Sequence, residues 1–133
     1  MKNHLPFLLI LISVYSGTSL AGGKNAANIA LKGKASYYGE NFAGKQTASG
    51  EVYDTRSFTA AHPSLPFGTL VHVTNLENQK TVVVRINNRG PFLEDKTRII
   101  DLSLAAAEKI KMIDRGVVPV KIQIKDPPDQ PTD

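Results

Sequence analysis

The spacing of apolar residues along the chain predicts short β-strands. Residues 118–124 carry Val or Ile at every second position, the pattern of a strand with one buried face. Residues 80–87 alternate in the same way through Val82, Val84 and Ile86, but Val83 makes the opposite face partly apolar as well. A strand that is apolar on both faces favours a barrel or a sandwich over an open sheet with one face in water.

Turn-forming residues separate further segments of the same kind. Strands are predicted at residues 34–38, 58–61, 69–74 and 98–102, and a turn at 75–79 makes residues 69–87 a β-hairpin. Ser103 can cap a helix that extends to about Met112. About five or six short strands, one packing helix and no repeat indicate a mostly β protein, and a small β-barrel is the natural architecture.

The two ends of the chain differ from this middle part. Residues 1–21 have a weakly basic start, an apolar run over 5–15 and small residues at Ser19 and Ala21, which together predict a signal peptide cleaved before Gly22. The alternative, a stable membrane anchor, is disfavoured because the run is shorter than the roughly 20 residues that cross a bilayer. Residues 22–32 are expected to form a flexible leader and 125–133 a Pro-rich disordered tail. The domain is therefore placed at 33–124, in an exported protein that is periplasmic or associated with the cell wall.

The amino-acid composition excludes several kinds of functional site. The chain has no cysteine, which excludes a disulfide, a thiolate nucleophile, a Cys-based zinc site and lipidation. The net charge of +4 is far weaker than the footprint of a nucleic-acid-binding domain, so no nucleic acid is expected as a partner. The histidines are scattered and no cofactor motif is present, so neither a metal nor a cofactor is predicted. Carboxylates remain, and two of them beside a groove could perform acid–base work on a glycosidic bond.

A set of motifs carries a family resemblance. In order they are Gly33-Lys34-Ala35-Ser36-Tyr37-Tyr38-Gly39, Thr47-Ala48-Ser49-Gly50-Glu51, Thr59-Ala60-Ala61-His62, Leu65-Pro66-Phe67-Gly68-Thr69, Asn87-Asn88-Arg89-Gly90-Pro91-Phe92 and Arg98-Ile99-Ile100-Asp101-Leu102-Ser103. Over residues 33–124 the chain resembles the RlpA (rare lipoprotein A) family of septal-ring lytic transglycosylases. The resemblance implies a six-stranded double-psi β-barrel with one short helix. It also implies cleavage of peptidoglycan glycan strands between N-acetylmuramic acid and N-acetylglucosamine, with a 1,6-anhydro sugar as the product.

Carried over by motif, the candidate catalytic residues of the family fall on Glu51, His62 and position 88. Here the sequence departs from the family, because Asn88 stands where the family has Asp. An amide can hydrogen-bond to a sugar but cannot exchange a proton with it. The resemblance therefore implies a catalytic set of Glu51, His62 and, as the substitute acid, Asp101.

Three further residues are expected to bind the substrate. Tyr38 is expected to stack on a sugar, Asn88 to donate a hydrogen bond to it, and Arg89 to orient either Asp101 or a sugar.

Each of the three catalytic candidates also has a structural interpretation. Glu51 could form a salt bridge within its loop, and His62 could be a hydrogen-bonded turn residue ahead of Pro63. Asp101 could cap the helix that begins near Ser103, or pair with Arg89 or Arg98. Three functions follow: a lytic transglycosylase, a non-catalytic peptidoglycan-binding or wall-loosening barrel, or an exported scaffold or inhibitor.

Overall fold

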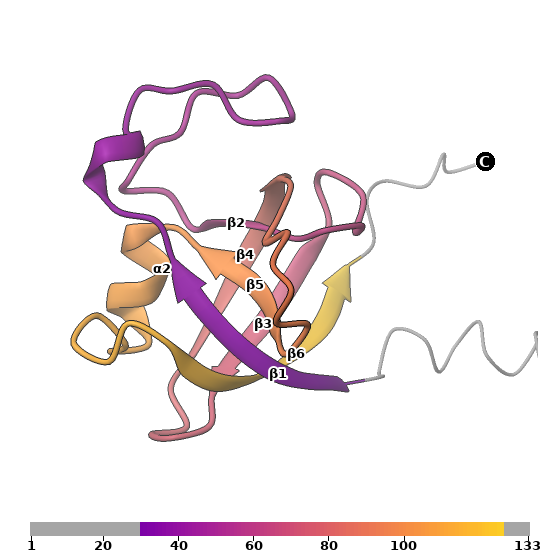
Figure 1. Ribbon diagram of the computed structural model, residues 1–133, viewed down its shortest axis with the longest axis vertical. Helices are drawn as coiled ribbons and strands as arrows, with labels where there is room; N and C mark the ends of the chain where they lie inside the picture. Colours follow the sequence, from indigo (N-terminus) through magenta and orange to yellow (C-terminus); the bar gives the residue numbers. More distant parts are fainter. Residues whose placement is uncertain (1–29, 127–133) are drawn as a thin grey trace, which may run out of the picture.

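The computed structural model describes residues 30–126, which form a closed six-stranded barrel (Figure 1). The strands are β1 (Ala30–Tyr37), β2 (Thr59–Ala61), β3 (Leu70–Asn75), β4 (Thr81–Asn88), β5 (Arg98–Leu102) and β6 (Val118–Asp126). Two short helices, η1 (Glu40–Phe42) and α2 (Leu104–Lys109), lie in the connections. The predicted fold class, a mostly β double-psi barrel with one short α-helix, is confirmed.

The strands follow one another around the barrel in the order β1-β5-β2-β4-β3-β6. The predicted hairpin is β3–β4, in which His72 faces Val83 in an antiparallel register. Two neighbouring pairs, β1–β5 and β2–β4, are parallel. The core lies inside the barrel and is made mainly by Val, Ile and Ala side chains, with α2 packed against it through Ala106 and Ala107.

The barrel is longer at both ends than the predicted 33–124. Strand β1 begins at Ala30, because Ala30, Leu31 and Lys32 pair with β6, with Leu31 opposite Ile122. Strand β6 continues to Asp126, which lies opposite Leu70 of β3. The predicted signal peptide at 1–21 and the remainder of the leader and tail lie outside the described residues. Among residues 30–126, no helix is long and apolar enough to cross a membrane.

The helix that follows β5 is shorter than predicted. Ser103 caps it as expected, accepting a hydrogen bond from the Ala106 amide at 3.3 Å. The helix ends at Lys109 rather than near Met112, because the amides of Lys111 and Met112 turn back to the carbonyls of Glu108 at 3.0 Å and Ala107 at 3.1 Å. Lys111 then takes a left-handed backbone conformation, with φ 57°. This left-handed residue ends the regular helical hydrogen bonding, and the Ile110 carbonyl accepts instead from the side-chain amides of Asn75 and Asn78, both at 3.0 Å.

Two irregularities in the parallel pairs shape one end of the barrel. Lys34 faces Arg98 but Ala35 faces Ile100, so β5 carries one extra residue between Arg98 and Ile100. Likewise Ala60 faces Ile86 but Ala61 faces Asn88, so β4 carries one extra residue next to Asn88. An extra residue in one strand of a pair re-aims the side chains that follow it.

Candidate functional site

Four neighbouring strands bring candidate site residues into one row. The Cα partners across β1, β5, β2 and β4 are Ser36, Asp101, Ala61 and Asn88 in turn. His62 follows Ala61 directly, and Tyr38 follows the end of β1. The row therefore gathers residues whose sequence positions differ by up to 65 at one edge of the barrel, just beyond the two extra residues.

A hollow of about 340 Å³ opens beside this row, and we call it the central cleft. Its lining includes Ser36, Tyr38, Phe42, Asn88, Arg98 and Asp101. Of the predicted site residues, Tyr38, Asn88 and Asp101 meet in this cleft. Glu51, His62 and Arg89 are not part of its lining.

Asp101 is held by two groups in the cleft. Its Oδ1 accepts a short hydrogen bond from the Ser36 hydroxyl and lies 3.3 Å from Nη2 of Arg98. Nη2 of Arg98 also donates to the Ser36 hydroxyl oxygen, so the three side chains form a closed triangle. Both charged side chains remain partly exposed, Asp101 at 21% and Arg98 at 28%. The carboxylate is therefore fixed through one oxygen while it still faces the cleft.

The triangle decides between the alternatives for Asp101. Its partner is Arg98, not Arg89, and the cap of α2 is the Ser103 hydroxyl. Ser36 and Arg98 were absent from the predicted site. In a regular strand, residues three apart point to opposite faces, and the extra residue in β5 brings Arg98 to the face of Asp101.

Tyr38 forms an aromatic wall of the cleft. Its ring packs edge-on against Tyr53, with centroids 4.7 Å apart, and against Phe42, at 6.1 Å. Burial, reinforced by the neighbouring Tyr53, raises the pKa of Tyr38 to about 12, so the hydroxyl stays protonated. Among the described residues, no group makes a well-aligned hydrogen bond with the Tyr38 hydroxyl. The side chains of Thr59 and Asn88 lie close to this hydroxyl and lower its pKa slightly, against the larger effect of burial. The neighbouring Tyr37 hydroxyl instead donates to the Ile113 carbonyl at 3.0 Å.

Two backbone amides hold the Asn88 side chain in place. Its Oδ1 accepts hydrogen bonds from the N–H of Ala48 at 3.0 Å and from the N–H of Arg89 at 2.9 Å. The side chain is thus held against the loop 47–51 while it lines the cleft. A carboxylate at position 88 would accept hydrogen bonds from the same two N–H groups.

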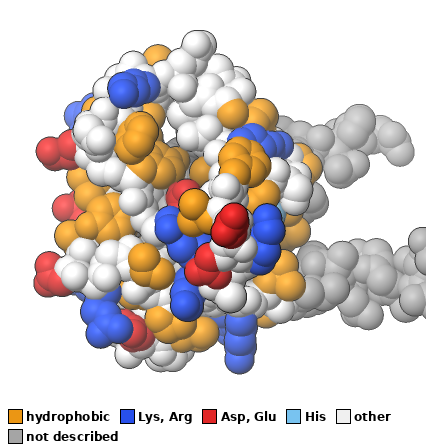
Figure 2. All heavy atoms as spheres, viewed as in Figure 1, with side chains coloured by type: hydrophobic (Ala, Val, Ile, Leu, Met, Phe, Trp, Pro, Cys, Tyr) orange, Lys and Arg blue, Asp and Glu red, His pale blue; other side chains and the backbone are white. Residues whose placement is uncertain are grey.

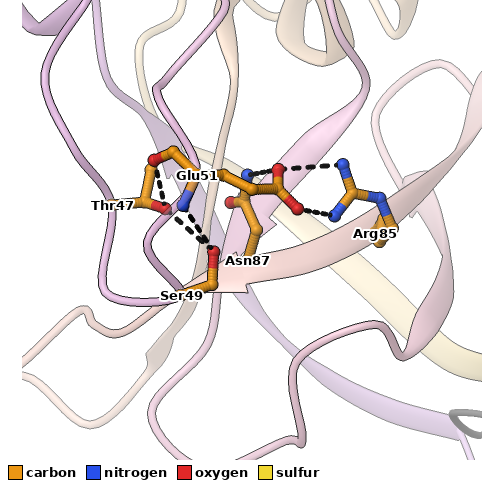
Figure 3. A network of polar contacts seen from close by, with 5 residues as sticks. All are labelled: Thr47, Ser49, Glu51, Arg85 and Asn87. Atoms are coloured by element: carbon orange, nitrogen blue, oxygen red, sulfur yellow. Dashed lines mark hydrogen bonds and ion pairs between the residues drawn. The ribbon is translucent and has the colours of Figure 1, made fainter.

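Glu51 anchors the loop 47–51 to strand β4 (Figure 3). Its carboxylate forms a two-pronged ion pair with Arg85, at 2.5 and 3.0 Å, and accepts a hydrogen bond from the Asn87 amide at 3.0 Å. The hydrogen bond from Arg85 and then that from Asn87 hold the pKa of Glu51 below its ordinary value. Glu51 is therefore an ionised residue that fixes the loop, and through the Ala48 amide it positions Asn88.

We predict that Glu51→Gln makes stability less dependent on pH. Because the folded pKa is lowered, the ion pair stabilises fully above the ordinary value of 4.5 and loses this contribution as pH falls through the lower folded pKa. The pair is exposed, so the loss at neutral pH should be under about 1 kcal/mol. Thermal unfolding of both proteins should therefore differ most at neutral pH and converge as the pH falls below the folded pKa of Glu51. A gap in Tm that persists at acid pH would contradict this role.

His62 serves the turn that follows β2. Its Nδ1 accepts hydrogen bonds from the amides of Ser64 and Leu65, both at 3.1 Å. A ring that accepts at Nδ1 carries its proton on Nε2, and a second proton would have to displace both amides. Burial, and then the Arg89 charge, lower the pKa of His62. The ring is thus a neutral donor through Nε2, which makes it a poor general base.

Arg89 braces the same turn rather than Asp101. Its Nη1 donates to the carbonyls of Leu65 at 2.8 Å and His62 at 3.3 Å, and its guanidinium lies over the Phe67 ring at 4.0 Å. Residues 30–126 contain no group of three or more His, Cys, Asp or Glu side chains that could hold a metal ion.

Comparison with known proteins finds a family model and curated proteins whose sequences are similar to this chain. The family model described as lytic transglycolase matches residues 30–122. The endolytic peptidoglycan transglycosylase RlpA of Pasteurella multocida is 50% identical over 101 residues, covering 76% of this chain and 34% of the relative. The protein of the same name from Campylobacter jejuni is 46% identical over 110 residues, covering 83% and 38%. The chain thus spans little more than a third of the length of these curated relatives.

Solved structures show the same barrel in other settings. The Streptomyces papain inhibitor matches with a TM-score of 0.57 and 30% identity, over 71% of this chain and 93% of that protein. An expansin from Clavibacter michiganensis matches with a TM-score of 0.55 over 78% of this chain and 54% of that protein. At 21% identity, the expansin match concerns the fold alone.

Proposed function

Because the chain belongs to the RlpA family of lytic transglycosylases, we propose that its barrel is an endolytic peptidoglycan transglycosylase. It would cleave the bond from N-acetylmuramic acid to N-acetylglucosamine and leave a 1,6-anhydromuramyl end. The observation that carries the proposal is Asp101, a carboxylate fixed by Ser36 and Arg98 in a cleft that is large enough for a sugar ring.

Asp101 would act as acid and then as base. In protonated form it gives its proton to the leaving glycosidic oxygen, and the bond from the muramic C1 to that oxygen breaks. The muramic C6 hydroxyl then attacks C1, and its proton returns to Asp101. No water enters the products, and one carboxyl group serves both steps. Arg98 would stabilise the carboxylate between the two proton transfers.

The other residues would hold the strand. Tyr38 and Phe42 offer aromatic surface beside Asp101, and Asn88, whose side chain lies close to the Tyr38 hydroxyl, offers its amide to the sugar. Glu51 would act by ordering the loop 47–51, and His62 and Arg89 by ordering the turn at 62–67. Together these residues would form a rigid rim around one carboxylate.

The proposed site of action is the cell wall. The relatives named above carry peptidoglycan in their names, and the predicted signal peptide at 1–21 would export the barrel. Peptidoglycan glycan strands are the proposed partner, without a lipid attachment, because the sequence has no cysteine.

A second candidate function is a peptidoglycan-binding or wall-loosening barrel that does not cut. It is favoured by Asn88, because a side-chain amide at the cleft wall cannot donate or accept the proton that bond cleavage requires. This function would use the same aromatic wall and the same cleft.

The deciding experiment is incubation of residues 22–133 with purified peptidoglycan, with and without stem peptides, followed by mass spectrometry. We expect soluble products with 1,6-anhydromuramyl ends. Absence of these products, together with retention of the protein on the sacculus, would establish the binding barrel instead.

A further inference from the structure

A second hollow of about 330 Å³ lies next to the central cleft. Its lining includes His62, Pro63, Phe92, Leu93, Lys96 and Arg98. Arg98 lines both hollows, so the two are adjacent across the residue that holds Asp101. A ligand long enough to cross Arg98 would therefore enter both.

The wall of this second hollow exposes an aromatic ring. Phe92 is 74% exposed, and Leu93 beside it is 40% exposed. Both belong to the segment that joins β4 to β5, over which acidic and basic side chains gather around apolar ones (Figure 2). An exposed apolar pair rimmed by polar groups is typical of a binding surface.

The segment that carries Phe92 is tied to the barrel at its far end. Asp95 Oδ1 accepts hydrogen bonds from the Thr97 amide at 2.9 Å and the Thr97 hydroxyl at 2.5 Å. The Thr97 carbonyl accepts from the Lys34 amide of β1 at 2.6 Å. The end of the segment next to β5 is thus fixed to strand β1.

His62 lines this hollow and also a third one, beside Leu31 and Val71. His62 uses Nδ1 for the Ser64 and Leu65 amides, so the ring nitrogen that remains for a ligand is Nε2, which carries the proton. A flat apolar surface beside a neutral donor suits a sugar ring, because one face of a pyranose is formed by C–H groups and its rim by hydroxyls.

We propose that the second hollow binds a further sugar of the same glycan strand, with the Phe92 ring as the platform and the His62 Nε2–H as a donor. This inference rests on the proposed function in taking the ligand to be a glycan. It makes Phe92 and His62 determinants of strand length, and it places Asp101 near the junction of two sugar sites.

The test is calorimetric titration with a disaccharide and a tetrasaccharide of alternating N-acetylglucosamine and N-acetylmuramic acid, without stem peptides. All proteins carry Asp101→Asn so that no strand is consumed. We expect the tetrasaccharide to bind at least about tenfold more tightly than the disaccharide, the scale expected for burying part of an aromatic ring. Phe92→Ala should abolish this gain and leave disaccharide binding unchanged.

Two control variants distinguish a loss of saccharide binding from a loss of the fold. Phe92→Tyr keeps the flat ring and should keep the gain. Phe58→Ala removes a phenylalanine that is 44% exposed and lines neither hollow, and it should change neither affinity. Equal affinities for the two saccharides, or a Phe92→Ala variant that keeps the gain, would overturn the inference.

A third variant tests the donor. His62→Asn keeps an oxygen for the turn amides but removes the Nε2–H, and it should weaken tetrasaccharide binding alone. A further titration uses the tetrasaccharide with stem peptides attached. If Phe92→Ala weakens binding of this ligand alone, the hollow binds peptide, which also overturns the inference. The proposed function is judged separately, by anhydro products from the protein with Asp101 intact.

Discussion

Replacement of Asp101 by Asn is expected to lower the rate of 1,6-anhydro product formation by about 10²–10⁴-fold, the usual contribution of a positioned acid–base group. Asn keeps an oxygen that can accept the Ser36 hydroxyl, but it can neither give nor take a proton. It also removes the charge that faces Arg98. The rate is measured by quantifying anhydromuramyl ends against time, and binding to intact sacculi should persist.

The matched control for this prediction is Asp54→Asn. Asp54 is also a carboxylate paired with an arginine, Arg56, at 3.3 Å, but it lies outside both hollows. Its replacement should leave the rate within about twofold, the expectation for a residue remote from the chemistry. If Asp101→Asn retained full turnover with an unchanged Tm, the acid would have to be another group and the assignment of Asp101 would fall.

Individual strands, and the pairing of strands that are adjacent in sequence, could be predicted from the sequence. The alternation in β4 and β6 predicts strands because Val and Ile at every second position fill the barrel interior. The β3–β4 pairing could be predicted because a turn joins the two strands directly. The parallel pairs β1–β5 and β2–β4 were not predicted, because their strands are distant in sequence and no local pattern encodes the partner.

The site was predictable in its residue types but not in its contacts. Asp101 could be named as a candidate acid, yet its partner depends on an extra residue in β5 that turns Arg98 to the same face. Glu51 occupies a family position, but only the fold brings Arg85 and Asn87 to its carboxylate. Amide donors at His62 Nδ1 and Asn88 Oδ1 come from the backbone, and side-chain identity does not reveal them.

The second large effect concerns position 88, where we expect Asn88→Asp to raise cleavage at least about tenfold, within the range of an added acid–base group. The replacement is nearly isosteric, and one new oxygen would keep the N–H donors of Ala48 and Arg89. Such donors favour the ionised form, so the new carboxylate should act as a base. Asp101 could then serve as the acid alone, with the two proton transfers divided between two groups.

Two further variants serve as controls for this prediction. Asn41→Asp adds the same charge in η1, on an exposed side chain, and should not raise the rate. Combining Asn88→Asp with Asp101→Asn should remove the gain if the two carboxylates act together. Unchanged turnover in Asn88→Asp would show that the amide costs this protein nothing and that position 88 only shapes the cleft. A gain that survives the loss of Asp101 would transfer the acid to position 88 and leave Asp101 as the partner of Arg98.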